Sequence, residues 1–116
     1  HVLSLNAMTG TVVDSEDRLG DQRSTISYDP ATQKYFGTTK SGELFSFGFN
    51  AENGTFKDFK RQSYGGMSTS TPLVYKGVVY WGHSSGNNFG GKFSVVASDA
   101  STLEEKWTAS IMMLKQ

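Results

Sequence analysis

The residues best suited to bind a ligand lie in one short stretch of the C-terminal half. Trp81 and His83 stand at the end of a predicted strand, and Asn88 follows in a glycine-rich loop from Ser84 to Gly91. An indole, an imidazole and an amide can together pack against and hydrogen-bond a small molecule. Binding favours loops on rigid scaffolds, although most loops only connect elements. Trp81, His83 and Asn88 are therefore the candidate ligand contacts, while a polar strand end beside a connecting hairpin loop is the interpretation that we favour.

Other residues that often carry catalysis lack the required arrangement. The glycine-rich loop is not followed by the Gly-Lys-Ser/Thr ending and helix that a phosphate site needs. Glu104 and Glu105 are adjacent on a predicted strand, so they point to opposite faces and cannot form an acid–base pair. Neither His1 nor His83 lies in a nucleophile motif such as Gly-x-Ser-x-Gly. We expect no catalytic site and no enzymatic activity.

An acidic cluster, Asp14-Ser15-Glu16-Asp17 with Asp21, is a candidate for metal binding. Ca²⁺ takes about six to eight oxygen ligands, and carboxylates on one loop could supply several of them. The spacing does not match a calcium loop, however, and Arg18 interrupts the cluster. We interpret the segment as a solvated loop between two structural units, and we expect no metal site.

Cysteine usage and charge exclude further classes of function. The absence of cysteine rules out disulfides, thiolate zinc sites and cysteine nucleophiles. Lys+Arg and Asp+Glu balance at 11 each, so the chain has no positive field to attract nucleic acid or anionic lipid. No apolar run approaches the roughly twenty residues of a membrane helix. We expect neither nucleic-acid binding nor membrane insertion.

Three similar segments organise the chain and would position any site. They are Leu3–Thr11, Phe47–Thr55 and Val96–Glu104. Their corner residues Asn6, Asn50 and Asp99 are separated by 44 and 49 residues. A period in the forties is typical of a four-stranded propeller blade or a two-helix repeat. Apolar residues alternate with small ones at a spacing of two, which favours strands.

Each segment contains a predicted tight turn after the alternating strand. An Asn or Asp side chain can accept bonds from backbone amides two or three residues on, and a glycine can supply a positive φ. The turn residues are Asn6, Gly10, Asn50, Gly54 and Asp99. Leu103 replaces glycine in the third segment, so we expect that turn to differ.

The segments between these turns complete four strands in each of two units. We predict an all-β fold, a partial β-propeller with two complete four-stranded antiparallel blades and half of a preceding one. The predicted units are a half blade at residues 1–21, a blade at 22–66 and a blade at 67–116. Because blades bury their faces against one another, we expect the chain to be a fragment or to pair its open edges with another copy.

The third unit resembles the repeat of PQQ-like (quinoprotein-type) β-propellers. The matching residues are Ser70-Thr71-Pro72, Gly77-Val78-Val79-Tyr80-Trp81-Gly82, Ser94-Val95-Val96-Ala97-Ser98-Asp99-Ala100-Ser101-Thr102 and Trp107. The resemblance implies a propeller fold in which Trp107 packs between blades. Asp14 and Asp58 occupy the position of Trp107 in the other two units, and Leu103 replaces the glycine of the family pattern.

Three functions are compatible with this resemblance. The first is a non-catalytic scaffold in an exported or cell-surface bacterial protein, which binds its remaining blades or a second copy, and a protein or carbohydrate ligand. The second is part of a PQQ-dependent dehydrogenase, which needs a stacked quinone, Ca²⁺, a carboxylate base and in many members a vicinal cysteine pair. The third resembles the propeller lipoprotein of outer-membrane assembly, which holds proteins by strand addition. We favour the scaffold and expect no cofactor.

Overall fold

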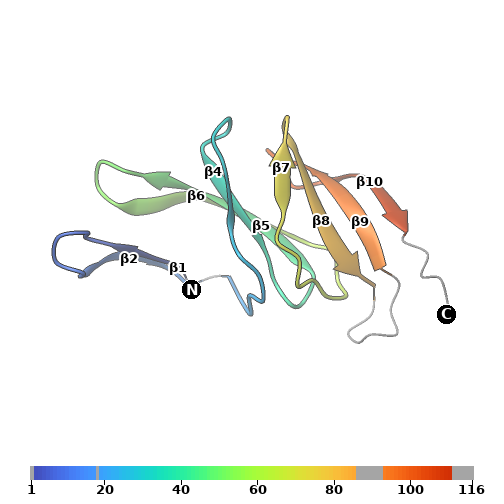
Figure 1. The fold of residues 1–116 in the computed structure, drawn as a ribbon, viewed down its shortest axis with the longest axis horizontal. Helices are drawn as coiled ribbons and strands as arrows, with labels where there is room; N and C mark the ends of the chain where they lie inside the picture. The colour runs from blue at the N-terminus through green and yellow to red at the C-terminus, as the bar shows by residue number, and fades with distance from the viewer. Residues whose placement is uncertain (1, 18, 86–92, 111–116) are drawn as a thin grey trace.

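The computed structural model describes residues 2–17, 19–85 and 93–110, whose regular structure is β-strand throughout (Figure 1). The predicted all-β fold is therefore confirmed. The strands are β1 (Val2–Leu5), β2 (Val12–Glu16), β3 (Ser27–Asp29), β4 (Lys34–Thr38), β5 (Glu43–Asn50), β6 (Thr55–Ser63), β7 (Leu73–Tyr75), β8 (Val78–Ser84), β9 (Phe93–Asp99) and β10 (Glu105–Ser110). This part of the chain has no helix long and apolar enough to span a membrane.

The strands form three antiparallel meanders that lie next to one another along the long axis of the molecule (Figure 1). The first sheet contains β1 and β2, the second has the order β3-β4-β5-β6, and the third has the order β7-β8-β9-β10. Consecutive strands paired in sequence order are the pattern of a propeller blade. The chain is thus a partial β-propeller with two four-stranded sheets and one two-stranded sheet, and it measures 53 × 27 × 23 Å.

The second and third sheets pack face to face through one apolar core. Its fully buried members are Phe36, Leu44, Val79, Trp81, Val96, Ala100 and Leu103, with Tyr64 and Val74 packed against them. Val79 and Trp81 on β8, and Val96 and Ser98 on β9, are buried at a spacing of two, because alternate side chains of a strand point to opposite faces. Burying each large side chain contributes about 1.5–3 kcal/mol, so this interface holds the two sheets together.

A second core lies on the opposite face of the second sheet. Leu19, Phe45 and Phe47 are fully buried there, and Val2 of β1 packs against them. Phe45 lies across Gly37 of the neighbouring strand, where an added Cβ would stand 2.4 Å from Phe45 Cζ. Gly37 is therefore required by the close approach of the Phe45 ring. The second sheet buries both of its faces, as a blade within a stack does.

Polar contacts join the inner strands of the two four-stranded sheets. The Thr38 hydroxyl donates to the carbonyl of Ser70 at 2.7 Å, and the Ser27 hydroxyl donates to the carbonyl of Pro72. The backbone N–H of Thr25 donates to the hydroxyl of Thr71 at 3.2 Å. These bonds attach β3, the segment before it and the end of β4 to the segment that leads into β7. They therefore fix the orientation of the second sheet relative to the third.

The three corner residues have the same surroundings. The side chain of Asn6 accepts from the backbone of Met8 and Thr9, that of Asn50 from Glu52, and that of Asp99 from Ser101 and Thr102. In each turn the residue four positions on donates its N–H to the corner carbonyl, at 2.7, 2.8 and 2.7 Å respectively. The strands before these turns, β1, β5 and β9, are therefore structurally equivalent.

The prediction that the third turn differs is wrong. Leu103 has a φ of 66°, close to 73° at Gly10 and 72° at Gly54, so the backbone makes the same turn without glycine. The Leu103 side chain is completely buried in the core between the second and third sheets. Burial of this side chain offsets the strain of the left-handed conformation, which costs about 1–2 kcal/mol.

The acidic cluster is not the loop that we expected. Asp14, Ser15 and Glu16 belong to β2, and only part of the cluster follows the strand. One carboxylate oxygen of Asp14 accepts the backbone N–H of Phe56 at 2.7 Å, which ties the first sheet to the second. The described residues include no group of three or more His, Cys, Asp or Glu side chains that could hold a metal ion. The cluster is part of the packing between sheets.

Candidate functional site

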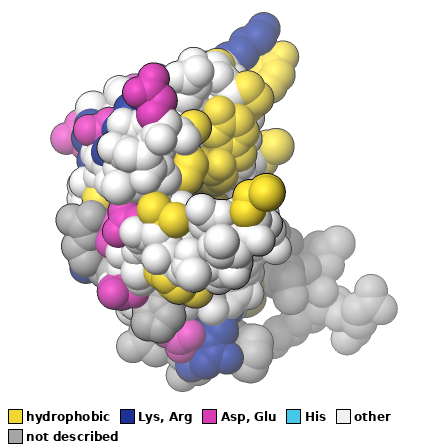
Figure 2. All heavy atoms as spheres, turned by 90° about the vertical axis from the view of Figure 1, so that its left-hand side faces the viewer, with side chains coloured by type: hydrophobic (Ala, Val, Ile, Leu, Met, Phe, Trp, Pro, Cys, Tyr) yellow, Lys and Arg dark blue, Asp and Glu magenta, His cyan; other side chains and the backbone are white. Residues whose placement is uncertain are grey.

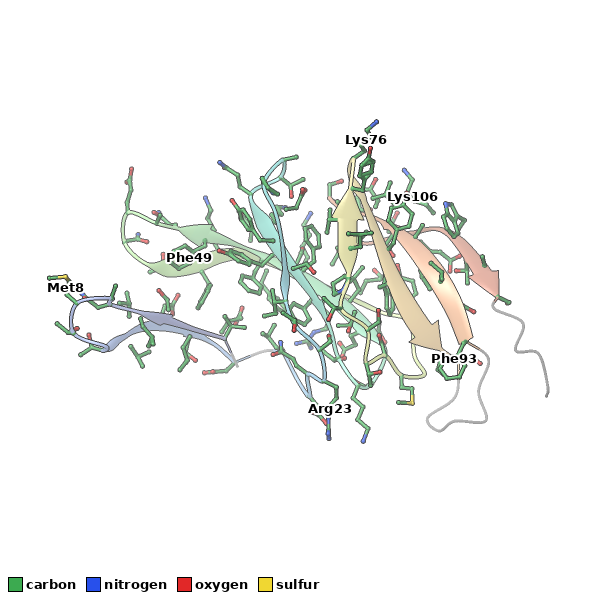
Figure 3. All side chains as sticks on the ribbon, viewed as in Figure 1. Met8, Arg23, Phe49, Lys76, Phe93 and Lys106 are labelled. Carbon is green, nitrogen blue, oxygen red and sulfur yellow. The ribbon has the colours of Figure 1, made fainter. Side chains whose placement is uncertain are left out.

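A pocket of about 410 Å³ lies between β1 and the aromatic face of the second sheet. The described residues that line it are Val2, Leu3, Ser4, Leu5, Ile26, Tyr35, Phe47, Phe49 and Phe56. Figure 2 shows hydrophobic side chains gathered on this end of the molecule, and Figure 3 shows Phe49 on the second sheet near the β1–β2 hairpin. The described lining contains no charged side chain.

The pocket wall follows from the alternation of large residues along β5. Phe47 pairs with Tyr35 across the β4–β5 ladder, and their rings stack with centroids 5.4 Å apart. Phe56 of β6 meets Phe47 edge-on at 5.3 Å and Phe49 at 5.5 Å. Such aromatic pairs are worth about 0.5–1.5 kcal/mol beyond their buried area, so these contacts stabilise the wall of the pocket. The sequence analysis did not identify this site, although the spacing of Phe45, Phe47 and Phe49 indicated one aromatic face.

The other side of the pocket is a strand edge. Within the described residues β1 pairs with β2, and its opposite edge carries no strand. The side chains of Leu3 and Leu5 are 50% and 54% exposed at this edge. The equivalent strands β5 and β9 have neighbours on both edges, β4 with β6 and β8 with β10. The pocket therefore occupies the position of a third strand of the first sheet.

The pocket does not fit the cofactor that the family resemblance implies. PQQ carries carboxylate groups that need cationic or strongly donating partners, and Ca²⁺ needs several oxygen ligands. The described lining offers one hydroxyl at Ser4 and one phenol at Tyr35, among otherwise hydrocarbon side chains. An unpaired anion in such surroundings is strongly disfavoured. We therefore derive no step that involves this cofactor.

Of the three predicted ligand contacts, Trp81 and His83 lie side by side on β8, with ring centroids 5.5 Å apart. Trp81 is 2% exposed, and its indole N–H donates to Ser98 Oγ at 3.1 Å, so it lies in the core and its contact with a ligand stays a prediction. It faces the core because its position on β8 points toward the second sheet. The imidazole Nε2 of His83 lies 2.6 Å from the carbonyl oxygen of Gly65. Asn88 lies outside the described residues.

Tyr64 is a further polar residue of this core that the sequence analysis missed. Its hydroxyl lies 2.8 Å from Ser98 Oγ and donates to the carbonyl of Leu103 at 2.5 Å. Its ring meets Trp81 edge-on with centroids 4.9 Å apart. Desolvation by burial raises the pKa of the Tyr64 phenol above its ordinary value, while the hydrogen bond to Ser98 opposes that rise. Tyr64 joins the second unit to the third and is a structural residue.

Trp107 does not lie between the two described four-stranded sheets. It pairs with Ala97 on β9, is 47% exposed, and contacts Tyr80 of its own sheet at a centroid distance of 6.0 Å. Cross-strand pairing places it on the same outer face as Leu73 and Tyr75, which are 66% and 56% exposed. The third sheet therefore presents a second exposed apolar face, opposite the core. Packing of Trp107 against a following blade remains a prediction.

The position equivalent to Trp107 also differs in the second unit. Gly48 pairs with Lys57, while Asp58 has a φ of 55° in the bulge of this ladder. The expected correspondence of Asp58 with Trp107 is thus displaced by one residue, because a bulge adds an unpaired residue to one strand. Asp14 pairs with Ser4 and does occupy the equivalent position in the first unit.

Comparison with known proteins finds similarity to solved structures but to no family model. No family model matches the chain, and no curated protein matches it. A solved structure of a europium-containing methanol dehydrogenase superposes with a TM-score of 0.55 and 29% sequence identity. The match covers 78% of this chain and 15% of that protein, so the chain spans only a small part of its neighbour. The chain is therefore similar in fold to a segment of a quinoprotein-type β-propeller.

Proposed function

We propose that this chain is a non-catalytic β-propeller scaffold segment that binds protein or another ligand. The observation that supports the proposal is the pair of apolar surfaces at its two ends. One surface is the pocket beside β1, and the other is the outer face of the third sheet with Leu73, Tyr75 and Trp107. Contiguous apolar surfaces of this kind mark interaction sites.

The stack of sheets supplies a physical reason for binding at both ends. Burying a large apolar side chain contributes about 1.5–3 kcal/mol, and each end offers several such side chains. The partners that we propose are the remaining blades of a parent protein or a second copy of the chain, with a protein or carbohydrate ligand on the loops. We propose that the scaffold belongs to an exported or cell-surface bacterial protein.

The second candidate function is part of a PQQ-dependent dehydrogenase. The name of the structural neighbour favours it, and the composition of the β1 pocket opposes it. A third candidate, a scaffold resembling the outer-membrane assembly lipoprotein, shares the binding role of the first. The three candidates differ in whether a quinone or a polypeptide is bound.

Titration of the purified chain with PQQ and Ca²⁺ separates the scaffold from the enzyme. We expect no saturable change in the quinone absorbance and no dye reduction in the presence of methanol. Saturable binding at one equivalent with a shifted absorbance would overturn the scaffold proposal. Circular dichroism of the same sample confirms that the chain is folded during the titration.

A further inference from the structure

The turn between β5 and β6 contains the sequence Asn53-Gly54-Thr55. An asparagine followed two residues later by serine or threonine, with no proline between them, is the acceptor sequence for N-linked glycosylation. The same turn serves the fold, because Gly54 has a φ of 72° and donates its N–H to the carbonyl of Asn50 at 2.8 Å. The hydrogen bonds of the turn show which atoms of Asn53 the fold uses.

The side-chain oxygen of Asn53 is part of the turn. Asn53 Oδ1 accepts the hydroxyl of Thr55 at 2.6 Å and the N–H of Thr55 at 3.2 Å. In the two equivalent turns the hydroxyl oxygens of Thr9 and Thr102 accept the backbone N–H two residues on, each at 3.3 Å. A threonine therefore suffices at this position, and the fold needs only an acceptor oxygen there.

The side-chain nitrogen of Asn53 is not used by the turn. Asn53 Nδ2 has no hydrogen-bond acceptor among the described residues. Of the three equivalent residues, Asn53 alone has an amide nitrogen. The residue is exposed, as are Ala51 and Glu52 before it. The nitrogen is therefore accessible to a reagent or an enzyme without unfolding of the turn.

The exposure of Asn53 does not depend on the first sheet having only two strands. Thr102 stands at the equivalent position of the third turn, which follows a complete four-stranded sheet, and it is exposed as well. Lys60 Nζ of that sheet donates to the carbonyl of Ser101 at 2.6 Å, so the sheet reaches the third turn without covering Thr102. Figure 1 shows the β5–β6 turn at the end of the molecule opposite the third sheet. A larger first sheet would therefore leave Asn53 in solvent.

We propose that Asn53 is an acceptor site for an N-linked glycan. The proposal rests on the exported or cell-surface location proposed above, because such acceptors are used on the surface of secreted proteins. The donor is an oligosaccharide linked to a polyprenyl diphosphate, and an oligosaccharyltransferase carries out the transfer. Asn53 Nδ2 attacks the anomeric carbon and loses one proton. A C–N bond forms, the C–O bond to the phosphate breaks, and the polyprenyl diphosphate leaves. A bulky, hydrophilic glycan fits an exposed turn.

Transfer to the purified, folded chain tests the proposal. The chain is incubated with the lipid-linked oligosaccharide and a purified oligosaccharyltransferase, and the tryptic peptide of residues 41–57 is analysed by mass spectrometry. We expect this peptide to gain the mass of one oligosaccharide, attached to Asn53. A synthetic peptide of the same residues shows whether the enzyme accepts the sequence outside the fold. No modification of the folded chain would overturn the proposal, whether or not the synthetic peptide is modified.

Two substitutions of Thr55 separate use of the acceptor sequence from exposure alone. Thr55→Ser keeps the hydroxyl and should retain transfer. Thr55→Val keeps the β-branched shape at the start of β6 but loses the hydroxyl, so it should reduce transfer at least about tenfold. Asn50 is the internal control in the same peptide, because Glu52 stands where an acceptor sequence needs serine or threonine. Equal transfer to the two variants, or modification of Asn50, would contradict the proposal. Circular dichroism checks that both variants are folded.

A second reaction of the same residue is distinguished in this experiment. The backbone nitrogen of Gly54 can attack the side-chain carbonyl carbon of Asn53, with loss of ammonia, and hydrolysis then leaves an acid without any sugar. A sample without the lipid-linked donor measures this background. In chain isolated from the cells that produce it, peptide 41–57 should carry a glycan, and a peptide without any glycan would overturn the proposal. Neither result alters the PQQ titration, so this proposal and the scaffold function fail separately.

Discussion

The ionisation of Asp99 is coupled to the turn at which it stands. The Ser101 hydroxyl and the backbone N–H groups of Ser101 and Thr102 donate to its carboxylate, and these bonds lower the pKa of Asp99 from 3.8 to about 2. Asn6 and Asn50 make the equivalent turns with a neutral amide. The corner therefore requires an acceptor oxygen and does not require a charge.

This comparison predicts effects of different size for two substitutions of Asp99. Asp99→Asn keeps the acceptor but loses the charge, so it should lower the midpoint of urea unfolding at pH 7 less than Asp99→Ala, which removes both. A depressed folded-state pKa contributes stability above the unfolded value of 3.8, which is lost as the pH falls through about 2. Asp99→Asn should remove this part of the acid dependence. An unchanged profile between pH 4 and 2 would contradict the assignment.

The corner at Asn50 permits an energetic test of the same turn. Its side chain accepts the N–H of Glu52 at 2.9 Å. We expect Asn50→Ala to lower the free energy of unfolding by about 0.5–1.5 kcal/mol, the net value of one hydrogen bond. Urea denaturation followed by tryptophan fluorescence measures it. No loss in either Asn50→Ala or Asp99→Ala would show that the side chain does not set the turn.

Leu103 shows burial outweighing backbone strain. Its φ of 66° favours glycine, but its side chain is fully buried. Leu103→Gly should lower the free energy of unfolding by about 2–4 kcal/mol, because the loss of a buried leucine exceeds the relief of strain. Gln33 is the matched control, since its φ is 57° and its side chain is exposed.

The control substitution should have the opposite sign. Gln33→Gly relieves the same strain without removing a buried side chain, so it should raise the free energy of unfolding by up to about 1 kcal/mol. Thermal unfolding by circular dichroism compares both variants. A stabilising Leu103→Gly would contradict the view that burial holds the third turn.

At the scale of elements, the contact between β4 and β5 depends on Gly37, which has no Cβ to collide with the Phe45 ring. An alanine at position 37 would place its Cβ 2.4 Å from the ring of Phe45. We expect Gly37→Ala to lower the free energy of unfolding by about 1–3 kcal/mol through overpacking. Phe45→Leu in the same chain should make the cost of Gly37→Ala smaller. Additive effects in this double-mutant cycle would rule out the steric explanation.

Tyr64 tests the attachment of the second unit to the third. Its hydroxyl contacts Ser98 and Leu103 of the third unit. Tyr64→Phe should lower the free energy of unfolding by about 0.5–1.5 kcal/mol. Tyr28→Phe is the control, because Tyr28 is 50% exposed and should change stability by less than about 0.5 kcal/mol. Equal effects on urea unfolding would contradict a specific role for the Tyr64 hydroxyl.

At the scale of the whole molecule, the repeat made the fold predictable from the sequence. Strand alternation and the corners Asn6, Asn50 and Asp99 were sufficient, because their local hydrogen bonds depend only on nearby residues. Strand starts were less predictable: the segment before Leu73 matches the family repeat, yet its polar groups bond across to the second unit and β7 begins only at Leu73.

The pocket could not be predicted from the sequence for a different reason. Its lining combines β1 with residues of the second sheet that are remote in sequence, such as Tyr35 and Phe56. Similarly, Trp81 and Trp107 have the same residue type but opposite burial, because they point to opposite faces of one sheet. Which face meets a neighbouring sheet depends on packing over long range and not on local pattern.

Nuclear Overhauser effects between side chains of neighbouring sheets test the central claim most directly, namely that successive sheets pack face to face as blades. We predict contacts of Tyr64 with Trp81 across one interface and of Val2 with Phe47 across the other. Observation of both sets in the isotopically labelled chain would support the stack. Contacts within single sheets only, with neither set between sheets, would contradict the face-to-face packing and therefore also the pocket at β1.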